Sequence, residues 1–534
     1  MQTTNNPILP GFHPDPSIVR VGEDYYVATS TFEWYPGVCI YHSKDLVNWQ
    51  LVARPLATTA MLDMRGNPDS CGVWAPCLTV KDNRFFLAFT NTRRFAGDFK
   101  DTPNFFTSAD DITGPWQAPI YVNSSGFDPS LFHDDDGKSY WLNMVWNHRP
   151  EGGRNNFSPA RFFGGVVCQE IDLETGALIG ENTLIYKGSE IGLTEGPHIH
   201  KKNGYYYLTL AEGGTGKDHA VTIARSTSLL GQYETSPTHH PVVTSANSPN
   251  TTLKRAGHGD WCDTPDGKTV LVHLCSRPLP YRGRSVLGRE TALQFLSWTD
   301  DDWPCLSHGG NHPQGHIDIA SEPQAANEYV DLTQSDLPDT YHSLRYPLPK
   351  DVAYRDENGF VLHGQESLGS WFEQSLLARR QQAFTYTYET TLDFAPTSFQ
   401  QMAGLTCYYN SKKYFYLHVT FDEDNGRVLD LSMCLNNWHS QYPMTVPIVL
   451  PEKGTISLKA SVVHDAVRFA YRTEGQPWQE LGLTLDYSVL CDEVGDGGAD
   501  ANFTGSFVGI CCQDLTGQKL PAVFSSVNYQ ETLD

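Results

Sequence analysis

The sequence Phe127-Asp128-Pro129-Ser130-Leu131-Phe132-His133-Asp134-Asp135-Asp136-Gly137-Lys138-Ser139-Tyr140-Trp141-Leu142 contains an acidic signature, a turn and an aromatic-rich run. The turn residues Asp135-Asp136-Gly137 separate two runs with strand-forming side chains, which predicts a β-hairpin. Two further copies occur in the chain, with Asp15 before Tyr25-Tyr26-Val27 and Glu195 before Tyr206-Tyr207-Leu208. In all three, the carboxylate precedes the last residue of the aromatic run by 12 to 14 residues.

The repeat extends to five units, although two of them lack the acidic residue. Trp74 precedes Phe85-Phe86-Leu87, and His258 precedes Val270-Leu271-Val272. The spacings between successive strands are 60, 55, 66 and 64 residues, counted between the residues Val27, Leu87, Leu142, Leu208 and Val272. Units of this length with hairpin-linked strands predict the blades of a β-propeller. We therefore expect an all-β fold with a five-bladed propeller over residues 1–325; an irregular β-sandwich is the alternative.

Equivalent positions in blades around an axis would bring Asp15, Asp128 and Glu195 to one place. Pairs of carboxyl groups flanking one bond are what the cleavage of a glycosidic bond requires. The alternative for each residue is a carboxylate that stabilises a turn or a buried part of the fold.

Composition excludes several classes of partner. The chain of 534 residues has a formal net charge of −24, which disfavours binding to nucleic acid or to an anionic membrane. No apolar run approaches membrane-spanning length. Residues 1–10 lack the basic and apolar parts of a signal peptide, and none of the 12 cysteines forms a Cys-x-x-Cys pair. We therefore expect a cytoplasmic protein with reduced thiols.

The chain changes character after about residue 320, where a polar, proline-containing stretch begins. Short alternating strands follow, for example at residues 384–391, 414–419 and 456–460. Such strands with polar turns predict a second domain, a β-sandwich over residues 326–534.

Five motifs in this order resemble those of the β-xylosidases of glycoside hydrolase family 43, of the type that also cleaves α-L-arabinofuranosides. They are residues 6–17, Trp74-Ala75-Pro76, Phe127-Asp128-Pro129-Ser130, Thr194-Glu195-Gly196-Pro197-His198 and Arg289-Glu290-Thr291. The resemblance covers nearly the whole chain. It implies an exo-acting, inverting enzyme that releases D-xylose from the non-reducing end of β-1,4-xylo-oligosaccharides, with side activity on α-L-arabinofuranosides. An α-L-arabinofuranosidase and a non-catalytic sugar-binding propeller are the alternatives.

The resemblance also implies roles for the three carboxylates. Asp15 matches the general base that activates water, Glu195 the general acid, and Asp128 a third carboxylate that raises the pKa of the acid and orients it. Chemistry agrees with this division, because a neighbouring negative charge keeps an acid protonated near neutral pH.

Other positions match residues that contact the sugar in this family: Phe32, Trp74, Ala75, Phe127, Thr215, His258, Arg289 and Phe507. Phe507 matches a loop of the second domain that helps to close the active-site pocket. We expect no metal ligand and no required cofactor, although a calcium ion or a water molecule is a candidate occupant near His258. His198 and His200 alternate on one strand and are interpreted as structural. A homo-oligomer, either a dimer or a tetramer, is also expected.

Overall fold

The computed structural model describes residues 4–149, 159–319, 325–495 and 502–532, and these are almost entirely β-strand and loop. They divide into two compact units. The first unit comprises Met1–Leu62, Cys71–Arg277 and Arg289–Pro323, and the second comprises Asp63–Ser70, Pro278–Gly288 and Gln324–Asp534. Among the described residues, no helix has the length and apolar character needed to cross a membrane.

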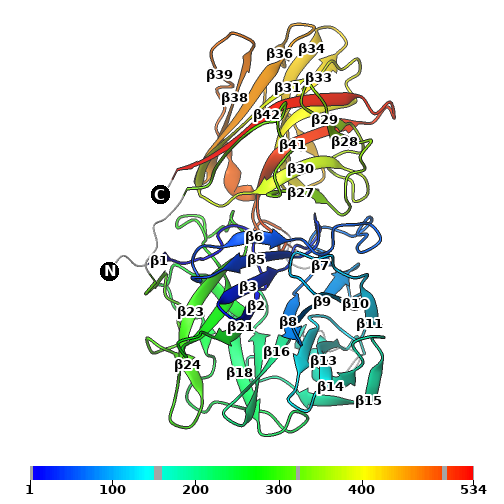
Figure 1. The fold of residues 1–534 in the computed structure, drawn as a ribbon. Helices are drawn as coiled ribbons and strands as arrows, with labels where there is room; N and C mark the ends of the chain where they lie inside the picture. Colours follow the sequence, from blue (N-terminus) through cyan, green and yellow to red (C-terminus); the bar gives the residue numbers. More distant parts are fainter. Residues whose placement is uncertain (1–3, 150–158, 320–324, 496–501, 533–534) are drawn as a thin grey trace. The chain divides into compact units, whose positions relative to one another are not determined.

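The first unit contains five antiparallel sheets that follow one another along the chain (Figure 1). Their strands, in order within each sheet, are β2 (Ser17–Val21), β3 (Asp24–Thr29), β5 (Cys39–Ser43) and β6 (Gln50–Ala53); β8 (Cys77–Lys81), β9 (Arg84–Thr92), β10 (Asn104–Ala109) and β11 (Ile120–Asn123), with β7 (Gly72–Val73) also on β9; β12 (Ser130–His133), β13 (Ser139–Trp146), β14 (Phe163–Ile171) and β15 (Leu178–Tyr186); β16 (Glu195–Lys202), β17 (Tyr205–Glu212), β18 (Ala220–Ser226) and β19 (Glu234–Thr235), with β20 (Val243–Thr244) also on β18; and β21 (Lys254–Asp263), β22 (Thr269–Ser276), β23 (Glu290–Trp298) and β24 (Pro304–Leu306). The first strands of the sheets contact one another in a closed ring, β2–β8–β12–β16–β21–β2. This arrangement confirms the predicted five-bladed propeller.

The repeated aromatic and aliphatic runs form the second strand of each blade. The residues that define the spacing are fully buried, at 0% exposure for Val27, Leu87, Leu142, Leu208 and Val272. They pack between neighbouring blades; for example, Leu142 of the third blade and Leu208 of the fourth belong to one apolar cluster. The repeat is visible in the sequence because each blade buries its second strand against a neighbouring blade.

The N-terminal segment, which precedes the first blade, lies along the fifth blade. The Asn6 amide donates to the Leu293 carbonyl at 2.8 Å, and its oxygen accepts from the Leu293 N–H at 2.9 Å. Leu9 forms a β-bridge with Thr291, and β1 (Thr4–Asn5) pairs with β25 (His316–Ile317). Ile8 and Leu9 also share an apolar cluster with residues of the first and fifth blades.

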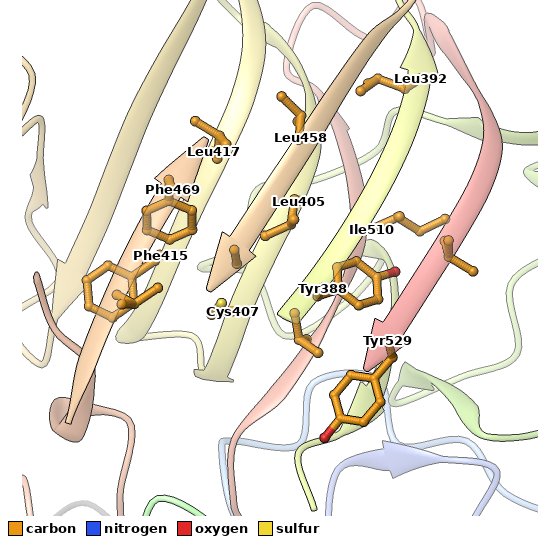
Figure 2. Close-up of a cluster of buried hydrophobic side chains, with 14 of the residues drawn as sticks. Tyr388, Leu392, Leu405, Cys407, Phe415, Leu417, Leu458, Phe469, Ile510 and Tyr529 are labelled. Carbon is orange, nitrogen blue, oxygen red and sulfur yellow. The ribbon is translucent and has the colours of Figure 1, made fainter. Parts of the chain in front are cut away.

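The second unit contains two antiparallel sheets that enclose one apolar core (Figure 2). One sheet has the order β28 (Ala353–Arg355), β29 (Phe360–His363), β42 (Pro521–Thr532), β31 (Thr385–Asp393), β37 (Ile456–Val463), β38 (Ala466–Thr473) and β39 (Gln479–Glu480), with β26 (Asn327–Asp331) on β42 and β40 (Leu485–Asp486) on β38. The other has the order β35 (Ser440–Gln441), β34 (Gly426–Leu435), β33 (Lys413–Asp422), β32 (Gln401–Asn410), β41 (Phe507–Asp514), β30 (Ser375–Arg380) and β27 (Tyr341–Leu344), with β36 (Ile448–Val449) on β34. Side chains from both sheets, including Leu405 and Leu458, meet in the core (Figure 2). The predicted β-sandwich is confirmed.

Two segments that precede residue 326 belong to this second unit. The fully buried Arg345 donates from Nε to the Asn67 carbonyl at 2.7 Å and from Nη2 to the Asp69 carboxylate at 2.9 Å. The Glu493 carboxylate accepts hydrogen bonds from the Ser285 N–H at 2.9 Å and from its hydroxyl at 2.8 Å. The sequence-based assignment of residues 1–325 to the propeller therefore differs from the structure over residues 63–70 and 278–288.

Candidate active site

The three candidate carboxylates lie where the first strands of their blades begin. Asp15 and Asp128 each stand two residues before β2 and β12, and Glu195 is the first residue of β16. Because these strands form the inner ring of the propeller, their starts share one end of its axis. The carboxylates interact electrostatically there, since Asp15 raises the pKa of both other groups. The recurrence in the sequence thus corresponds to a convergence in space.

At two of the three carboxylates the backbone adopts an unfavourable conformation. Asp15 has a φ of 54° and Asp128 a φ of 52°, in the left-handed region that residues with a Cβ atom rarely occupy. His258 on β21 has a φ of 45°. Such strain persists only where the surrounding structure imposes it, and it is typical of functional sites.

Asp15 is surrounded by groups that stabilise its ionised form. The Ser30 hydroxyl donates to its Oδ2 at 2.6 Å, and Arg289 Nη1 lies 3.5 Å from its Oδ1. His258 Nδ1 lies 3.8 Å from the same oxygen. Burial by itself would raise the pKa of Asp15, but Arg289, His258 and the Ser30 hydrogen bond together hold that pKa below its ordinary value. Asp15 is therefore a carboxylate at neutral pH.

Glu195 and Asp128 have the opposite character. Burial, reinforced by the charge of Asp15, raises the pKa of Glu195 to about 8. Burial also raises the pKa of Asp128 well above its ordinary value, and the charges of Glu195 and Asp15 add to this effect. Two such carboxyl groups titrate as a pair, and this pair retains a proton at neutral pH. The site thus combines one ionised carboxylate, Asp15, with a pair of carboxyl groups that holds one proton between them.

Gly196 connects Asp128 with Glu195. Its N–H donates to Asp128 Oδ2 at 3.1 Å, while the preceding residue is Glu195 itself. Gly196 has a φ of 61°, and a Cβ atom there would lie 2.8 Å from the His258 ring. Only glycine satisfies both conditions, which gives a physical reason for the Glu-Gly pair in the sequence motif.

Three of the predicted aromatic contacts come from the first three blades and lie next to one another. The ring centroids of Phe32 and Trp74 are 6.3 Å apart, and those of Trp74 and Phe127 are 5.0 Å apart. The Arg289 guanidinium lies 5.0 Å from the centre of the Phe32 ring. Ala75 is buried next to Trp74 in the chain. Flat apolar rings with a few polar groups are typical of sugar-binding sites.

The places of two further predicted sugar contacts, Thr215 and Phe507, are described by their own elements. Thr215 lies partly buried in the loop that follows β17. Phe507 is the first residue of β41 in the second unit, where it is fully buried and where Arg380 lies 5.6 Å from the centre of its ring. Its contact with the sugar stays a prediction.

Sequence reasoning missed two polar residues at the carboxylates. Ser30 directly follows β3, in the polar run Thr29-Ser30-Thr31. A polar run at the end of the second strand of a blade is a sequence signal that could have identified it. Lys100 interacts with Glu195 and donates to the Phe95 carbonyl at 2.7 Å. Burial lowers the pKa of Lys100 to about 8. It lies in a loop outside the repeat, so no pattern in the sequence pointed to it.

His198 and His200 both face Asp260. His200 Nε2 lies 2.7 Å from Asp260 Oδ1, and His198 Nδ1 lies 3.6 Å from Oδ2. The Ser17 hydroxyl and the Ile18 N–H also donate to Oδ2, each at 3.0 Å. Asp260 therefore links β2, β16 and β21 within the inner ring. Within the described ranges, no group of three or more His, Cys, Asp or Glu side chains is arranged to hold a metal ion.

His258 has a neutral, buried imidazole next to the site, because burial lowers its pKa to about 4. Its Nε2 is buried, and the described residues offer it no hydrogen-bond partner. A polar atom in this situation suits a water molecule or an ion, so the predicted occupant near His258 stays a prediction.

Comparison with known proteins assigns both parts of the chain. Residues 4–304 match the model of the glycosyl hydrolases family 43, and residues 330–530 match the β-xylosidase C-terminal concanavalin A-like domain. The chain belongs to glycoside hydrolase family 43. It is therefore a glycosidase.

Relatives of this family-43 chain match over its full length. It is 46% identical to the xylosidase/arabinosidase 43B of Humicola insolens, over 99% of this chain and 98% of the relative. It is 42% identical to a β-xylosidase of Bacillus subtilis (strain 168), over 98% and 99% of the two chains. The crystal structure of a xylan β-1,4-xylosidase from Bacillus halodurans C-125 superimposes with a TM-score of 0.93 at 45% identity, covering 99% of this chain and 100% of that one.

Proposed function

We propose that this enzyme removes D-xylose from the non-reducing end of β-1,4-xylo-oligosaccharides and inverts the anomeric configuration. The observation that carries the proposal is the contrast between Asp15, whose pKa is lowered, and the Glu195–Asp128 pair, whose pKa values are raised. A glycosidase of either stereochemical type needs one ionised carboxylate and one protonated acid at the scissile bond, and inversion is what membership in family 43 implies. The printed names of the relatives, which include xylosidases, support xylose as the sugar.

In this mechanism Asp15 accepts a proton from a water molecule as the water attacks the anomeric carbon. Arg289 and the Ser30 hydroxyl keep Asp15 ionised until that step. Glu195, which is partly exposed, delivers its proton to the departing glycosidic oxygen. In this proposal Asp128 shares a proton with the acid, because the charge of Glu195 raises the pKa of Asp128, and Asp128 is held through the Gly196 N–H. The rings of Phe32, Trp74 and Phe127 would pack on the sugar and exclude water.

Arabinofuranoside cleavage is the second activity of this proposal, because the relative from Humicola insolens is named for both sugars. Initial rates on 4-nitrophenyl β-D-xylopyranoside and 4-nitrophenyl α-L-arabinofuranoside, measured side by side, test the order of preference. We expect a higher kcat/KM for the xyloside and a smaller but measurable value for the arabinofuranoside. A higher value for the arabinofuranoside would make arabinofuranosidase the main activity. Glu195→Gln serves as the inactive control for release of xylose from xylobiose, and full activity in that variant would refute the site.

We further propose that Phe507 helps to close the sugar pocket. The residue before it supports this idea, because the Ser506 N–H donates to the Val286 carbonyl at 3.1 Å. Val286 stands three residues before Arg289 in the chain, so the residue that precedes β41 is bonded to the segment that leads to Arg289.

The proposals of a cytoplasmic location and of a homo-oligomer, dimer or tetramer, rest on the sequence and the family resemblance. Analytical ultracentrifugation of the purified chain tests the oligomer, and a monomer at micromolar concentration would refute it. Fractionation of the native host tests the location, and recovery of the activity in the culture medium would refute it.

A further inference from the structure

A short loop leads from β15 to the candidate acid Glu195. It comprises Gly188-Ser189-Glu190-Ile191-Gly192-Leu193-Thr194 and includes two glycines and one leucine with positive φ: 97° at Gly188, 72° at Gly192 and 54° at Leu193. A leucine in the left-handed region is strained and requires support from its surroundings. The loop therefore cannot be held by its local backbone preferences.

The side chain of Glu212 supplies that support. Its Oε1 accepts hydrogen bonds from the Ser189 N–H at 2.8 Å and from the Thr194 hydroxyl at 2.7 Å. Its Oε2 accepts from the Ser189 hydroxyl at 2.6 Å. Glu212 is fully buried, so these groups have replaced the water that a carboxylate would otherwise bind. One side chain thus fastens both ends of the loop.

Glu212 also lies beside the acid in the sheet. It is the last residue of β17, and the residue before it, Ala211, is the cross-strand partner of Glu195. The next residue, Gly213, donates its N–H to the Gly192 carbonyl of the loop at 2.8 Å. Gly188 permits this close packing, because a Cβ atom there would lie 2.2 Å from the Thr194 hydroxyl.

We propose that Glu212 is a positioning residue that sets the direction of the Glu195 side chain by holding Thr194, the residue immediately before it. The inference rests on the proposed role of Glu195 as the general acid. Glu212 does not act on the charge of Glu195 in this account; it fixes the place from which Glu195 donates its proton. Its loss should therefore impair only the reactions that need the donated proton.

The leaving group of the substrate provides the test. In xylobiose the departing xylose unit would be an unstable alkoxide without the donated proton, so its departure needs the acid. In 2,4-dinitrophenyl β-D-xyloside the departing group is a stable phenolate that does not need the proton. General acid catalysis contributes about 10²- to 10⁴-fold. We expect Glu212→Ala to lower kcat on xylobiose about 100-fold, within that range, and to change kcat on the dinitrophenyl substrate by less than about threefold.

Two further variants separate positioning from folding. Thr194→Val removes only the hydroxyl that contacts Glu212 and keeps the branched shape of the side chain. It should lower kcat on xylobiose by about tenfold and leave kcat on the dinitrophenyl substrate nearly unchanged. Glu212→Gln keeps an oxygen for Ser189 and Thr194 and should recover most of the rate lost in Glu212→Ala. Glu181→Ala, which removes an exposed carboxylate on β15, is the matched control for a loss of charge.

The outcomes are distinguishable. Equal losses on both substrates in Glu212→Ala and Thr194→Val, or no loss in either variant, would overturn the positioning role. Glu195→Gln is measured in parallel and should show the strongest dependence on the leaving group. If Glu195→Gln lost activity equally on both substrates, the assignment of Glu195 as the acid would fail, and that failure would be recognised independently of Glu212.

Discussion

Replacement of Arg289 by glutamine should move the acidic limb of the pH–rate profile to higher pH. The guanidinium lies 3.5 Å from the Asp15 carboxylate, and among the groups that lower the pKa of Asp15 it has the largest effect. At an effective dielectric constant of about 20, two unit charges at that distance attract each other by about 5 kcal/mol. This upper bound corresponds to about 3.5 pKa units, and a rise of about 1–3 units is expected for a carboxylate that loses an arginine.

The direction in which the acidic limb moves follows from the role of Asp15 as the base. The base works when ionised, so activity is lost as the pH falls through its pKa. Without the cation, the burial of Asp15 raises that pKa, and the loss begins at a higher pH. The limb should be read from kcat/KM, which reports the free enzyme, with 4-nitrophenyl β-D-xylopyranoside as substrate. Ser30→Ala, which removes a 2.6 Å hydrogen bond, should move the limb in the same direction by about 1 unit.

Arg84→Gln is the matched control, because Arg84 pairs with the exposed Asp110 far along the chain from Asp15. Circular dichroism of each variant shows whether it is folded. A folded and measurably active Arg289→Gln enzyme whose acidic limb coincides with that of the wild type would refute the assignment of Asp15 as the base stabilised by Arg289.

Four further results are expected. Proton NMR of the first product from a β-xyloside should show α-xylose, and initial release of β-xylose would indicate a covalent intermediate instead. Asp128→Asn removes the negative charge that opposes ionisation of Glu195, so the upper limb of the profile should move to lower pH; an unmoved limb in a folded, active variant would show that Asp128 does not tune the acid. Gly196→Ala should lower kcat at least about tenfold, because the new Cβ would collide with the His258 ring and displace the acid next to it; wild-type kinetics would contradict this. Phe507→Ala should raise KM or lower kcat while the far-ultraviolet circular dichroism spectrum stays unchanged, and unchanged kinetics would exclude Phe507 from the pocket.

The propeller could be predicted because each blade repeats the same physical requirement. A turn followed by a largely buried strand recurs five times, and fully buried residues such as Val27 and Leu208 mark it in the sequence. The three carboxylates could be found because they occupy the starts of equivalent inner strands. Their roles followed from a family resemblance, and the contrast in their pKa values agrees with it.

The supporting residues could not be predicted in the same way. Lys100 and Glu212 reach the site from a loop and from the far end of a second strand, where the repeat leaves no common residue type. Each contact depends on how a particular loop folds back, as with Thr194 and Glu212, and spacing in the sequence does not encode that fold. Residues that act through another residue are therefore harder to find than those that carry the chemistry.

The membership of residues 63–70 and 278–288 in the second unit bears on how this protein is synthesised and how its gene can be divided. On the ribosome, both segments emerge hundreds of residues before β42, which pairs with β26, β29 and β31 to complete one sheet of the sandwich. Arg345 and Glu493 are likewise translated after the segments that they bind. The second unit must therefore recruit chain that was made long before, and it can mature only near the end of translation. A chimaera joined at residue 326 would separate Arg345 and Glu493 from their partners unless both early segments were transferred with them.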